Sequence, residues 1–281
     1  MVASLDMDEP RSTEKARSFG QVSDAYDRGR PSYPPDATAW LVCDKPDRVL
    51  ELGAGTGQLT EQLVALGHDV IATDVSEPML RRLAARVPSA PRALAEAEHL
   101  PVRTRSVDLV VAAQAFHWFD VARALPEIAR VLRPGRSLAV VWNSRDERIP
   151  WVRRLGAIIG EGGHQSDPTA AIDESGMFET VQSSTFRFWQ PMTLPSLRDL
   201  VTSRSNIAVL SDAERDRVLG KVDALYDEYG RGADGMLLPY VTRAYRAAVL
   251  PWAVREDPHE VTRRPGGPED MDTDALLIDF N

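Results

Sequence analysis

Residues 48–67, RVLELGAGTGQLTEQLVALG, join a short apolar segment to a helical pattern through a loop with three glycines. RVLEL is rich in aliphatic side chains, which favours a buried strand. The helical part ends at Gly67, a residue type common just after a helix. A glycine turn between strand and helix lets a ligand approach backbone amides, because no Cβ stands in the way. The segment therefore predicts a strand–helix unit with a ligand site at its turn.

The same order of strand, loop and helix continues to residue 143. HDVIATD, VDLVVAAQ and RSLAVVWN read as further strands, and helices are predicted after Ser76, as an N-cap, and from about Asp120 to Leu132. Strands that alternate with helices of this length are typical of a parallel sheet covered on both faces. We therefore predict an α/β fold with right-handed crossovers.

The regular alternation ends after Asn143. TVQSSTFRFW and YVTRAYRAAVL read as strands, the second of which closes the sheet, and a helix is expected after Ser211, which has Glu214 at capping-box spacing. We predict one domain over residues 12–249, with an N-terminal lid at 12–34 and an inserted helical lid or substrate region at 150–235. Residues 1–11 and the acidic, Pro/Gly-rich tail 263–281 are predicted to be disordered.

Composition excludes several classes of function. The formal net charge is −9 and no basic run is present, so we expect no nucleic-acid partner. A single cysteine, without ligand spacing around it, predicts neither a disulfide nor a metal site. The N-terminus lacks the features of a signal peptide, and no apolar run approaches the roughly 18 residues of a membrane span. We therefore expect a cytoplasmic protein that does not bind membranes.

The glycine loop departs from the dinucleotide fingerprint. Its spacing is Gly53-x-Gly55-x-Gly57, and Gln58 stands where a pyrophosphate-binding loop would need its third glycine. Glu51 precedes the loop, where a carboxylate would repel a pyrophosphate but would hold an ammonium group.

A second acid follows at the end of the next predicted strand. A carboxylate at Asp74 can accept two hydrogen bonds from the hydroxyls of a ribose. Together with Glu51, it indicates a ligand that has a ribose and a cationic end but no pyrophosphate. S-adenosylmethionine fits that description.

The chain from about Arg17 to Ala248 resembles the class I S-adenosylmethionine-dependent methyltransferases with the type 11 core. VLELGAGTGQLT matches the first motif of that family and ATDVSEPML the second, while AEAEHLP, SVDLVVAAQAFHWFD and RVLRPGRSLAVVWN resemble the later ones. Among these enzymes it looks most like the trans-aconitate and cantharidin-type small-molecule methyltransferases. The resemblance implies a Rossmann-like, seven-stranded, mostly parallel sheet whose last strand is antiparallel. One departure is Arg136, where the pattern usually has a second glycine.

The resemblance also implies roles for individual residues. The three glycines would line the methionine part of the cofactor, with Glu51 at its amino group and Asp74 at its ribose. Gln114 would lie beside the methionine tail and the transferred methyl group. The other residues implied to bind the cofactor are Val75 and Met79 beside adenine, Ala97 and Glu98 at the adenine edge, and Tyr26 and Arg30 in the N-terminal lid. The alternative for the last two is a polar surface turn.

Two further candidates follow Gln114 at the carboxyl end of the predicted strand, where ligands of open α/β sheets bind. His117 is a candidate general base or positioning donor, and the alternative is a histidine that orders the loop. Trp118 is a candidate wall of the acceptor pocket, and the alternative is loop packing. Trp142 and Asn143 are predicted to end the next strand at the same edge.

These observations predict a methyltransferase that moves a methyl group from S-adenosylmethionine to a small organic acceptor and leaves S-adenosylhomocysteine. The resemblance favours a carboxylate or phenolic oxygen, and we expect a monomer or a weak homodimer. An NAD(P)-dependent oxidoreductase is the alternative enzyme, disfavoured by Gln58 and by the lack of a Tyr-x-x-x-Lys pair. A non-catalytic regulator that binds S-adenosylmethionine is the alternative outside enzymes.

Overall fold

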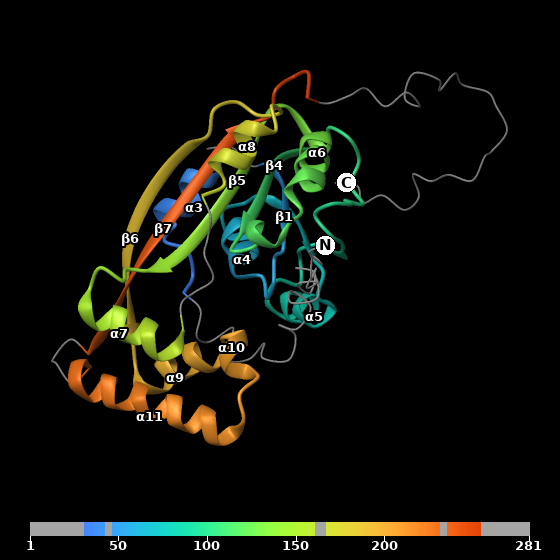
Figure 1. Cartoon of the computed structure of the whole chain (residues 1–281). Helices are drawn as coiled ribbons and strands as arrows, with labels where there is room; N and C mark the ends of the chain where they lie inside the picture. Colours follow the sequence, from blue (N-terminus) through green and yellow to red (C-terminus); the bar gives the residue numbers. More distant parts are fainter. Residues whose placement is uncertain (1–30, 43–46, 161–166, 231–234, 254–281) are drawn as a thin grey trace, which may run out of the picture.

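The computed structural model describes residues 31–42, 47–160, 167–230 and 235–253. Its centre is a seven-stranded sheet in the order β3-β2-β1-β4-β5-β7-β6 (Figure 1). The predictions for residues 1–11 and 263–281, and for most of the N-terminal lid, lie outside the described residues.

Five neighbouring strands are parallel, as predicted. β1 pairs with β2 on one side and with β4 on the other, β2 pairs with β3, and β4 pairs with β5. Their bounds are β1 Arg48–Leu52, β2 Asp69–Asp74, β3 Arg92–Leu94, β4 Val107–Ala113 and β5 Leu132–Arg145. Because the strands are parallel, their carboxyl ends meet at one edge of the sheet, where the predicted site residues follow β1, β2 and β4.

Helices cover both faces of this parallel part. On one face, Leu59 and Leu63 of α4 (Gln58–Ala65) pack in a buried cluster with Val49 of β1. On the other, Ile128 of α6 (Val121–Val131) packs in a cluster with Leu50. The alternation along β1 therefore directs neighbouring side chains to opposite helix layers. The remaining helices here are α3 (Pro35–Leu41), α5 (Glu77–Arg86) and the short 3₁₀ helix η2 (Phe116–Trp118).

The last two strands run antiparallel to their neighbours. β7 (Met236–Ala248) pairs with β5 from Ser137 opposite Ala248 to Arg145 opposite Tyr240, and β6 (Gln182–Met192) pairs with the outer side of β7. The seven strands and the antiparallel last strand confirm the predicted architecture. β6 lies inside the span 150–235 that the sequence predicted as an insertion, yet it belongs to the sheet, so that span contributes to the central fold as well.

Four helices of that span gather at the far ends of β6 and β7 (Figure 1). They are α7 (Pro150–Ile159), α9 (Leu194–Thr202), α10 (Ser205–Ala208) and α11 (Asp212–Tyr229), and we refer to them as the helical group. They share a buried cluster with the strands, which includes Leu155, Leu197, Leu225 and Leu238. The group is therefore packed onto β6 and β7 through a cluster that is separate from those of the parallel strands. The separate helix α8 (Thr169–Glu174) lies earlier in the chain than β6.

The capping box predicted at the start of α11 is present. The carboxylate of Glu214 accepts a hydrogen bond from the backbone N–H of Ser211 at 3.1 Å and one from its hydroxyl at 2.6 Å. The first turn of the longest helix in the group is therefore closed by its own side chains.

Arg136 lies near the beginning of β5, away from the carboxyl edge of the sheet. Its guanidinium is 3.3 Å from Asp108 Oδ1 and 3.6 Å from Asp47 Oδ1. Because these contacts lie at the amino ends of the strands, the departure from the family's glycine pattern is remote from the glycine loop.

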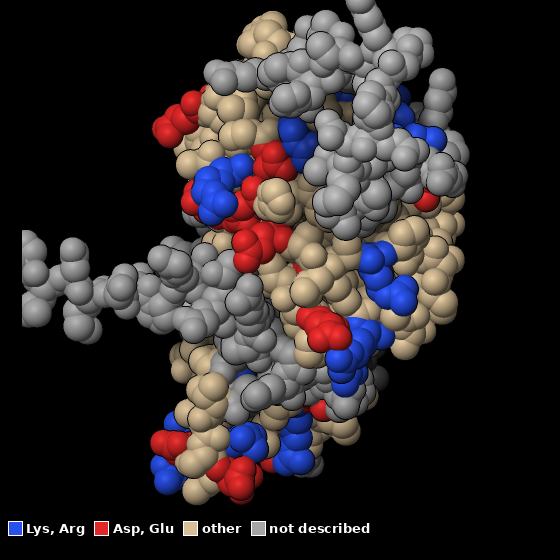
Figure 2. Space-filling view, turned by 90° about the vertical axis from the view of Figure 1, so that its right-hand side faces the viewer, with Lys and Arg blue, Asp and Glu red and all other residues tan. Residues whose placement is uncertain are grey.

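Charged side chains of both signs are interspersed among the described residues on the face drawn in Figure 2. None of the helices within the described ranges is both long enough and apolar enough to cross a membrane.

Candidate functional site

The three glycines of the loop between β1 and α4 all have positive φ angles. The values are 65° at Gly53, 58° at Gly55 and 84° at Gly57, which is the N-cap of α4. This left-handed backbone is costly for residues that carry a Cβ. The sequence pattern thus produces a turn that folds back tightly above the end of β1.

The space around the three glycines differs, which distinguishes glycines needed for close packing from a glycine that faces a ligand site. A Cβ on Gly53 would lie 2.5 Å from Cβ of Ala115, and one on Gly57 would lie 2.9 Å from Cγ of Leu83. A Cβ on Gly55 would meet no atom within 4 Å. Gly53 and Gly57 are therefore required by the close approach of neighbouring elements, whereas Gly55 borders open space that a ligand can enter.

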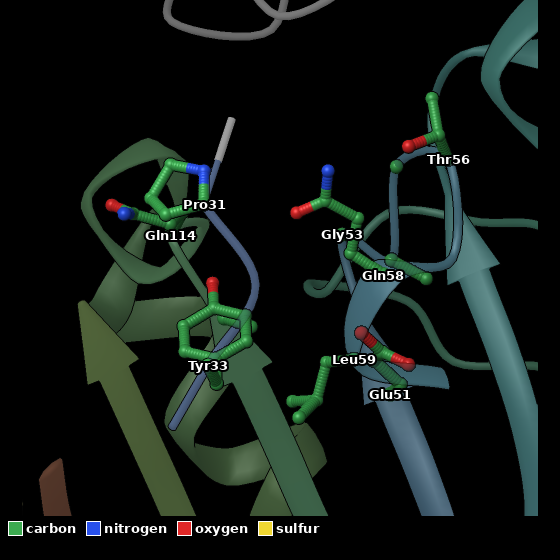
Figure 3. Close-up of a pocket in the computed structure, with 11 residues that line it drawn as sticks. Pro31, Tyr33, Glu51, Gly53, Thr56, Gln58, Leu59 and Gln114 are labelled. Atoms are coloured by element: carbon green, nitrogen blue, oxygen red, sulfur yellow. The ribbon is translucent and has the colours of Figure 1, made fainter. Parts of the chain in front are cut away.

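A cleft of about 460 Å³, counted with its part open to solvent, lies beside this loop (Figure 3). In Figure 3, Pro31, Tyr33 and Gln114 lie on one side of the cleft, opposite Thr56 and Gln58. The lining residues are Pro31, Tyr33, Glu51, Gly53, Ala54, Gly55, Thr56, Gln58, Leu59, Ala113 and Gln114. The structure thus brings together Glu51, Gly53, Gly55 and Gln114 of the predicted site.

Glu51 is a buried carboxyl group at this cleft. Only 1% of the residue is exposed, and Oε2 accepts a 2.6 Å hydrogen bond from the hydroxyl of Thr60. Burial, reinforced by the nearby Asp74, raises the pKa of Glu51 to about 8, although the Thr60 bond opposes this shift. The group is therefore largely protonated at neutral pH when no positive charge is close to it.

Asp74 joins the glycine loop to the start of α5. One carboxylate oxygen accepts the backbone N–H of Gly55 and the other that of Ser76, both at 2.8 Å. Burial raises the pKa of Asp74, and the backbone hydrogen bonds oppose the increase. Asp74 is not among the described residues that line the cleft, but it holds in place Gly55, which is.

The prediction of Ser76 as the N-cap residue of α5 is confirmed in position. Ser76 occupies the N-cap position of α5, but its hydroxyl makes no capping hydrogen bond and finds no partner within the described residues. The N–H of Ser76 itself donates to the carboxylate of Asp74, which ties the end of β2 to the start of α5.

Gln114 has an unusual backbone at the end of β4. Its φ is 57°, a left-handed value that is uncommon outside glycine. Its N–H donates to the carbonyl of Val141 at 2.9 Å, and its side-chain Nε2 donates to the carbonyl of Asn143 at 2.9 Å. Non-glycine residues in this region often mark functional sites, where surrounding contacts impose the conformation.

Asn143 connects Gln114 to the rest of the cleft. Its Nδ2 donates to the carbonyl of Ser32 at 3.2 Å, next to the lining residues Pro31 and Tyr33, and its Oδ1 accepts a 2.6 Å hydrogen bond from the hydroxyl of Thr242. Asn143 therefore ties the N-terminal segment to β5 and β7. Tyr26 and Arg30, predicted in that same segment, lie outside the described residues.

His117 and Trp118 form the end of η2, and both are half-buried. The indole Nε1–H of Trp142 donates to Nδ1 of His117 at 3.4 Å, and the rings of His117 and Trp118 lie 4.8 Å apart between centroids. Trp142 itself is 2% exposed and packs edge-on against Phe116. Neither His117 nor Trp118 lines the described part of the cleft.

The residues predicted at adenine lie on elements next to the loop but outside the described cleft lining. Met79 is buried in the first turn of α5, and Val75, half-buried, follows Asp74. Ala97 is buried, and a carboxylate oxygen of Glu98 accepts the N–H of Asp120 at 2.7 Å. Glu98 thus anchors its loop to the start of α6.

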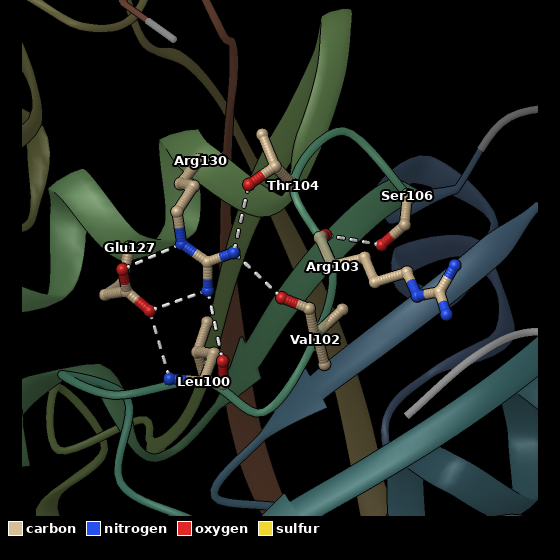
Figure 4. A network of polar contacts seen from close by, with 7 residues as sticks. All are labelled: Leu100, Val102, Arg103, Thr104, Ser106, Glu127 and Arg130. Atoms are coloured by element: carbon tan, nitrogen blue, oxygen red, sulfur yellow. Dashed lines mark hydrogen bonds and ion pairs between the residues drawn. The ribbon is translucent and has the colours of Figure 1, made fainter. Parts of the chain in front are cut away.

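The loop that carries Ala97 and Glu98 is also held by Arg130 of α6 (Figure 4). The Arg130 guanidinium donates to the carbonyls of Leu100 at 3.0 Å and Val102 at 2.8 Å, and both carboxylate oxygens of Glu127 accept from the same group. Hydrogen bonds from arginine to backbone carbonyls fix a loop that has no strand of its own. The predicted adenine edge is therefore a fixed element.

Sequence reasoning missed the roles of three residues. Thr60 points from α4 to Glu51, Asn143 holds Gln114 and Ser32, and Gln58 lines the cleft. The only local signals were a threonine one helical turn after Gly57 and an amide at a strand end. Within the described residues, no cluster of His, Cys, Asp and Glu could hold a metal ion.

Comparisons with known proteins show the family to which the chain belongs. A family model described as a methyltransferase domain matches residues 50–140. An uncharacterized methyltransferase of Mycobacterium tuberculosis is 46% identical over 234 residues, which cover 83% of this chain and 96% of the relative. An uncharacterized methyltransferase of Schizosaccharomyces pombe is 32% identical over 246 residues, which cover 84% of this chain and 98% of the relative.

Solved structures show the same fold. A type II methyltransferase from Anaeromyxobacter dehalogenans is 25% identical with a TM-score of 0.58, covering 81% of this chain and 99% of that one. Phosphoethanolamine N-methyltransferase 2 from Haemonchus contortus, in complex with phosphomonomethylethanolamine and S-adenosylhomocysteine, is 17% identical with a TM-score of 0.52. The match covers 89% of this chain and 61% of that one and shows the fold alone. The chain belongs to the class I S-adenosylmethionine-dependent methyltransferase family.

Proposed function

We propose that this protein transfers a methyl group from S-adenosylmethionine to a small organic acceptor and releases S-adenosylhomocysteine. The observation that carries the proposal is the arrangement of Gly55 and Glu51 at one cleft. An open space above a left-handed glycine lies beside a buried carboxyl group that lacks a positive partner within the described residues.

The residues at the cleft fit this cofactor. An ammonium group near Glu51 would favour the ionised carboxylate and satisfy a charge that burial otherwise suppresses. A pyrophosphate would instead meet Glu51 as a second negative group, which disfavours a dinucleotide. The relative from Haemonchus contortus was solved with S-adenosylhomocysteine, and the two chains share their fold.

When bound, S-adenosylmethionine supplies the methyl group as a reactive sulfonium. The protein's part is then to bind, align and exclude water. We assign the amino group to Glu51 and the close backbone approach to Gly55. We assign Gln114 to the side of the cleft next to the methyl group. Its side chain is held there by a hydrogen bond to the carbonyl of Asn143. The ribose is assigned to Asp74 and the adenine to Val75, Met79, Ala97 and Glu98, as the family resemblance implies.

We further propose that His117 is a positioning donor rather than a general base. Since Nδ1 accepts the Trp142 N–H, the proton of the neutral ring resides on Nε2. To act as a base, Nε2 would need the other tautomer, which would turn an N–H of His117 toward the N–H of Trp142. A carboxylate acceptor is already deprotonated and needs no base, so this arrangement favours carboxylates over phenols and amines. Trp118 stays the proposed wall of the acceptor site.

The acceptor is proposed to be a small molecule rather than a nucleic acid or a membrane lipid, because the chain carries a net charge of −9. A monomer or weak homodimer, and a lid role for the helical group, complete the proposal. The lid role is supported by the cluster that holds the helical group on β6 and β7, which is separate from the clusters of the parallel strands.

Calorimetry tests the cofactor assignment. S-adenosylmethionine and S-adenosylhomocysteine should bind with micromolar affinity, and NAD should not bind; binding of NAD alone would reject the proposal. The acceptor is then sought by measuring S-adenosylhomocysteine release with small carboxylates, phenols and amines. Turnover of carboxylates supports the role given to His117, and turnover confined to amines or phenols contradicts it.

A further inference from the structure

Arg145, the last residue of β5, is a buried arginine whose hydrogen bonding is incomplete. Its side chain is 9% exposed, and it stands opposite Tyr240 of β7. The Nε atom is shielded from solvent and has no hydrogen-bond partner within the described residues. A buried donor without an acceptor is unfavourable and calls for an explanation, such as a ligand that completes the site.

Other arginines of the chain show what the missing contact is. In Arg130, Nε and Nη2 each donate to one carboxylate oxygen of Glu127, at 2.9 and 2.8 Å. In Arg148, the same two atoms donate to the two carboxylate oxygens of Asp146, at 2.7 and 2.5 Å. In Arg145 only one of these two donors is engaged. Nη2 lies 3.3 Å from Oε1 of Glu147, while Nε has no acceptor within the described residues. The Nε and Nη2 side of the Arg145 guanidinium can therefore bind both oxygens of a carboxylate, of which Glu147 provides only one.

Position along β5 connects Arg145 to the cleft. Asn143, two residues earlier, holds the side chain of Gln114 through its carbonyl. Alternate residues of a strand face the same side, so the side chains of Asn143 and Arg145 leave β5 on one face, roughly 6.8 Å apart along the strand. That direction leads from the rim at Gln114 toward the helical group, whose α7 begins at Pro150. An acceptor held by Arg145 would therefore lie between the cofactor cleft and the helical group.

We propose that Arg145 binds a carboxylate of the methyl acceptor through its Nε and Nη2 atoms. This carboxylate is an anchor, distinct from the atom that is methylated, so the acceptor carries at least one carboxylate besides its reactive group. The side chain of Glu147, 45% exposed, competes for the same edge and yields to the acceptor. The inference rests on the proposed function and adds the substrate class to it.

One test needs no knowledge of the acceptor. Arg145→Met keeps a long apolar stem and removes the guanidinium, whose hydrogen bonding is incomplete. Because the guanidinium lacks a full partner, the melting temperature of this variant should equal or exceed that of the wild type. Arg130→Met, which breaks a complete network, is the matched control and should melt several degrees lower. A comparable loss in Arg145→Met would show that Arg145 is structural and would overturn the proposal.

A second test measures the ligand. Protein saturated with S-adenosylhomocysteine is titrated calorimetrically with malonate, succinate, glutarate and benzoate, with inorganic phosphate, and with the dimethyl esters of the dicarboxylates. At least one carboxylate should bind, and its Kd should rise tenfold or more in Arg145→Met. The same rise is expected in Arg145→Lys, which keeps the positive charge but lacks the paired Nε and Nη2 donors. Glu147→Gln should lower that Kd several-fold, because it weakens the competitor.

The outcomes separate this inference from the proposed function. Binding of S-adenosylhomocysteine should be the same in Arg145→Met and the wild type. If the wild type does not bind it at all, the proposed function fails, and the carboxylates are then titrated without cofactor. Equal carboxylate binding in Arg145→Met and the wild type, or binding of phosphate alone, would overturn the role of Arg145. Absence of carboxylate binding in the wild type would overturn it as well.

Discussion

The hydroxyl of Thr60 donates a 2.6 Å hydrogen bond to Oε2 of Glu51, and both side chains are buried. This is the main polar contact that lowers the pKa of a carboxyl group which burial raises to about 8. The pair therefore holds Glu51 near the balance between its neutral and charged forms at physiological pH. A cationic ligand group can shift that balance at little cost, which makes the pair a sensitive point for mutation.

We expect the free energy of unfolding of the ligand-free protein to fall as the pH rises from about 4.5 to about 8. Over this range the folded state retains a proton on Glu51 that the unfolded state releases, so raising the pH favours unfolding. The contribution is fully present below the unfolded pKa and is lost above about 8. Since one pKa unit corresponds to about 1.4 kcal/mol, the loss between pH 6 and 8 should be roughly 2–3 kcal/mol.

Urea unfolding at several pH values measures this slope, with Glu51→Gln as the control. Glutamine cannot ionise, so the free energy of unfolding of the variant should fall much less as the pH rises. The variant should also be more stable than the wild type at pH 9. It should also bind S-adenosylhomocysteine more weakly. An identical slope in both proteins would mean that Glu51 titrates normally.

Thr60→Val should raise the pKa of Glu51 further, because the hydrogen bond that favours the carboxylate is removed. Cofactor affinity at pH 7 should then fall about tenfold, equivalent to about 1.4 kcal/mol, and recover as the pH is raised. Thr60→Ser keeps the hydroxyl and should behave like the wild type. Calorimetry at pH 7 and pH 9 distinguishes this from a packing defect, which would weaken binding equally at both.

Alanine at Gly53 and alanine at Gly55 should give two different defects. Gly53→Ala should lose roughly 2–4 kcal/mol of stability, since its Cβ would lie 2.5 Å from Cβ of Ala115 in addition to the strained φ. Gly55→Ala meets no neighbouring atom and should lose only about 1 kcal/mol, but its methyl group occupies the cleft and should impair cofactor binding.

The double variant Gly53→Ala with Ala115→Gly tests the close approach directly. Removing the second Cβ should restore part of the lost stability, to the level set by backbone strain alone. Thermal unfolding of the four proteins measures the coupling between the two sites. Simple additivity of the two substitutions would refute the contact.

Asp74→Ala should weaken cofactor binding and also lower stability, each by roughly 1–3 kcal/mol. The stability loss is expected because the amides of Gly55 and Ser76 both lose their acceptor. Asp74→Asn keeps one acceptor oxygen and should be intermediate in stability. Parallel calorimetry and urea unfolding separate the two effects; unchanged cofactor affinity in both variants would remove Asp74 from the ribose site.

His117 should be found as the tautomer with its proton on Nε2. In long-range ¹H–¹⁵N NMR spectra, Nδ1 should show the chemical shift of an unprotonated nitrogen near pH 8. Trp142→Phe removes the indole N–H that donates to Nδ1, and it should increase the population of the Nδ1–H form. A wild-type spectrum dominated by Nδ1–H would contradict the proposed donor role of His117.

Much of the fold followed from short segments. The parallel part of the sheet, the position of the glycine loop and the edge where Gln114 emerges were all predicted, because strand alternation and helix periodicity report burial directly. The glycines at Gly53 and Gly57 were predicted as part of a ligand loop. In the tertiary structure these two serve packing, whereas Gly55 borders the open space.

The remaining features depend on contacts between distant residues. Nothing near Ser76 in the sequence indicates that its hydroxyl would make no capping hydrogen bond, or that Asp74 would accept the N–H groups of both Gly55 and Ser76. Likewise, β6 reads as a strand within a helical span, and its place beside β7 is a matter of long-range pairing.

The sequence by itself determined the type of fold, the glycine turn and the chemical kinds of group that meet at its edge. Local patterns are sufficient for these, because each depends on burial and backbone conformation within one element. The tertiary structure decided the state of those groups: the pKa of Glu51 is raised because it is buried, and Nδ1 of His117 is an acceptor because Trp142 reaches it. Protonation and hydrogen bonding are set by surroundings that distant segments assemble, and the short-range pattern of residues does not contain them.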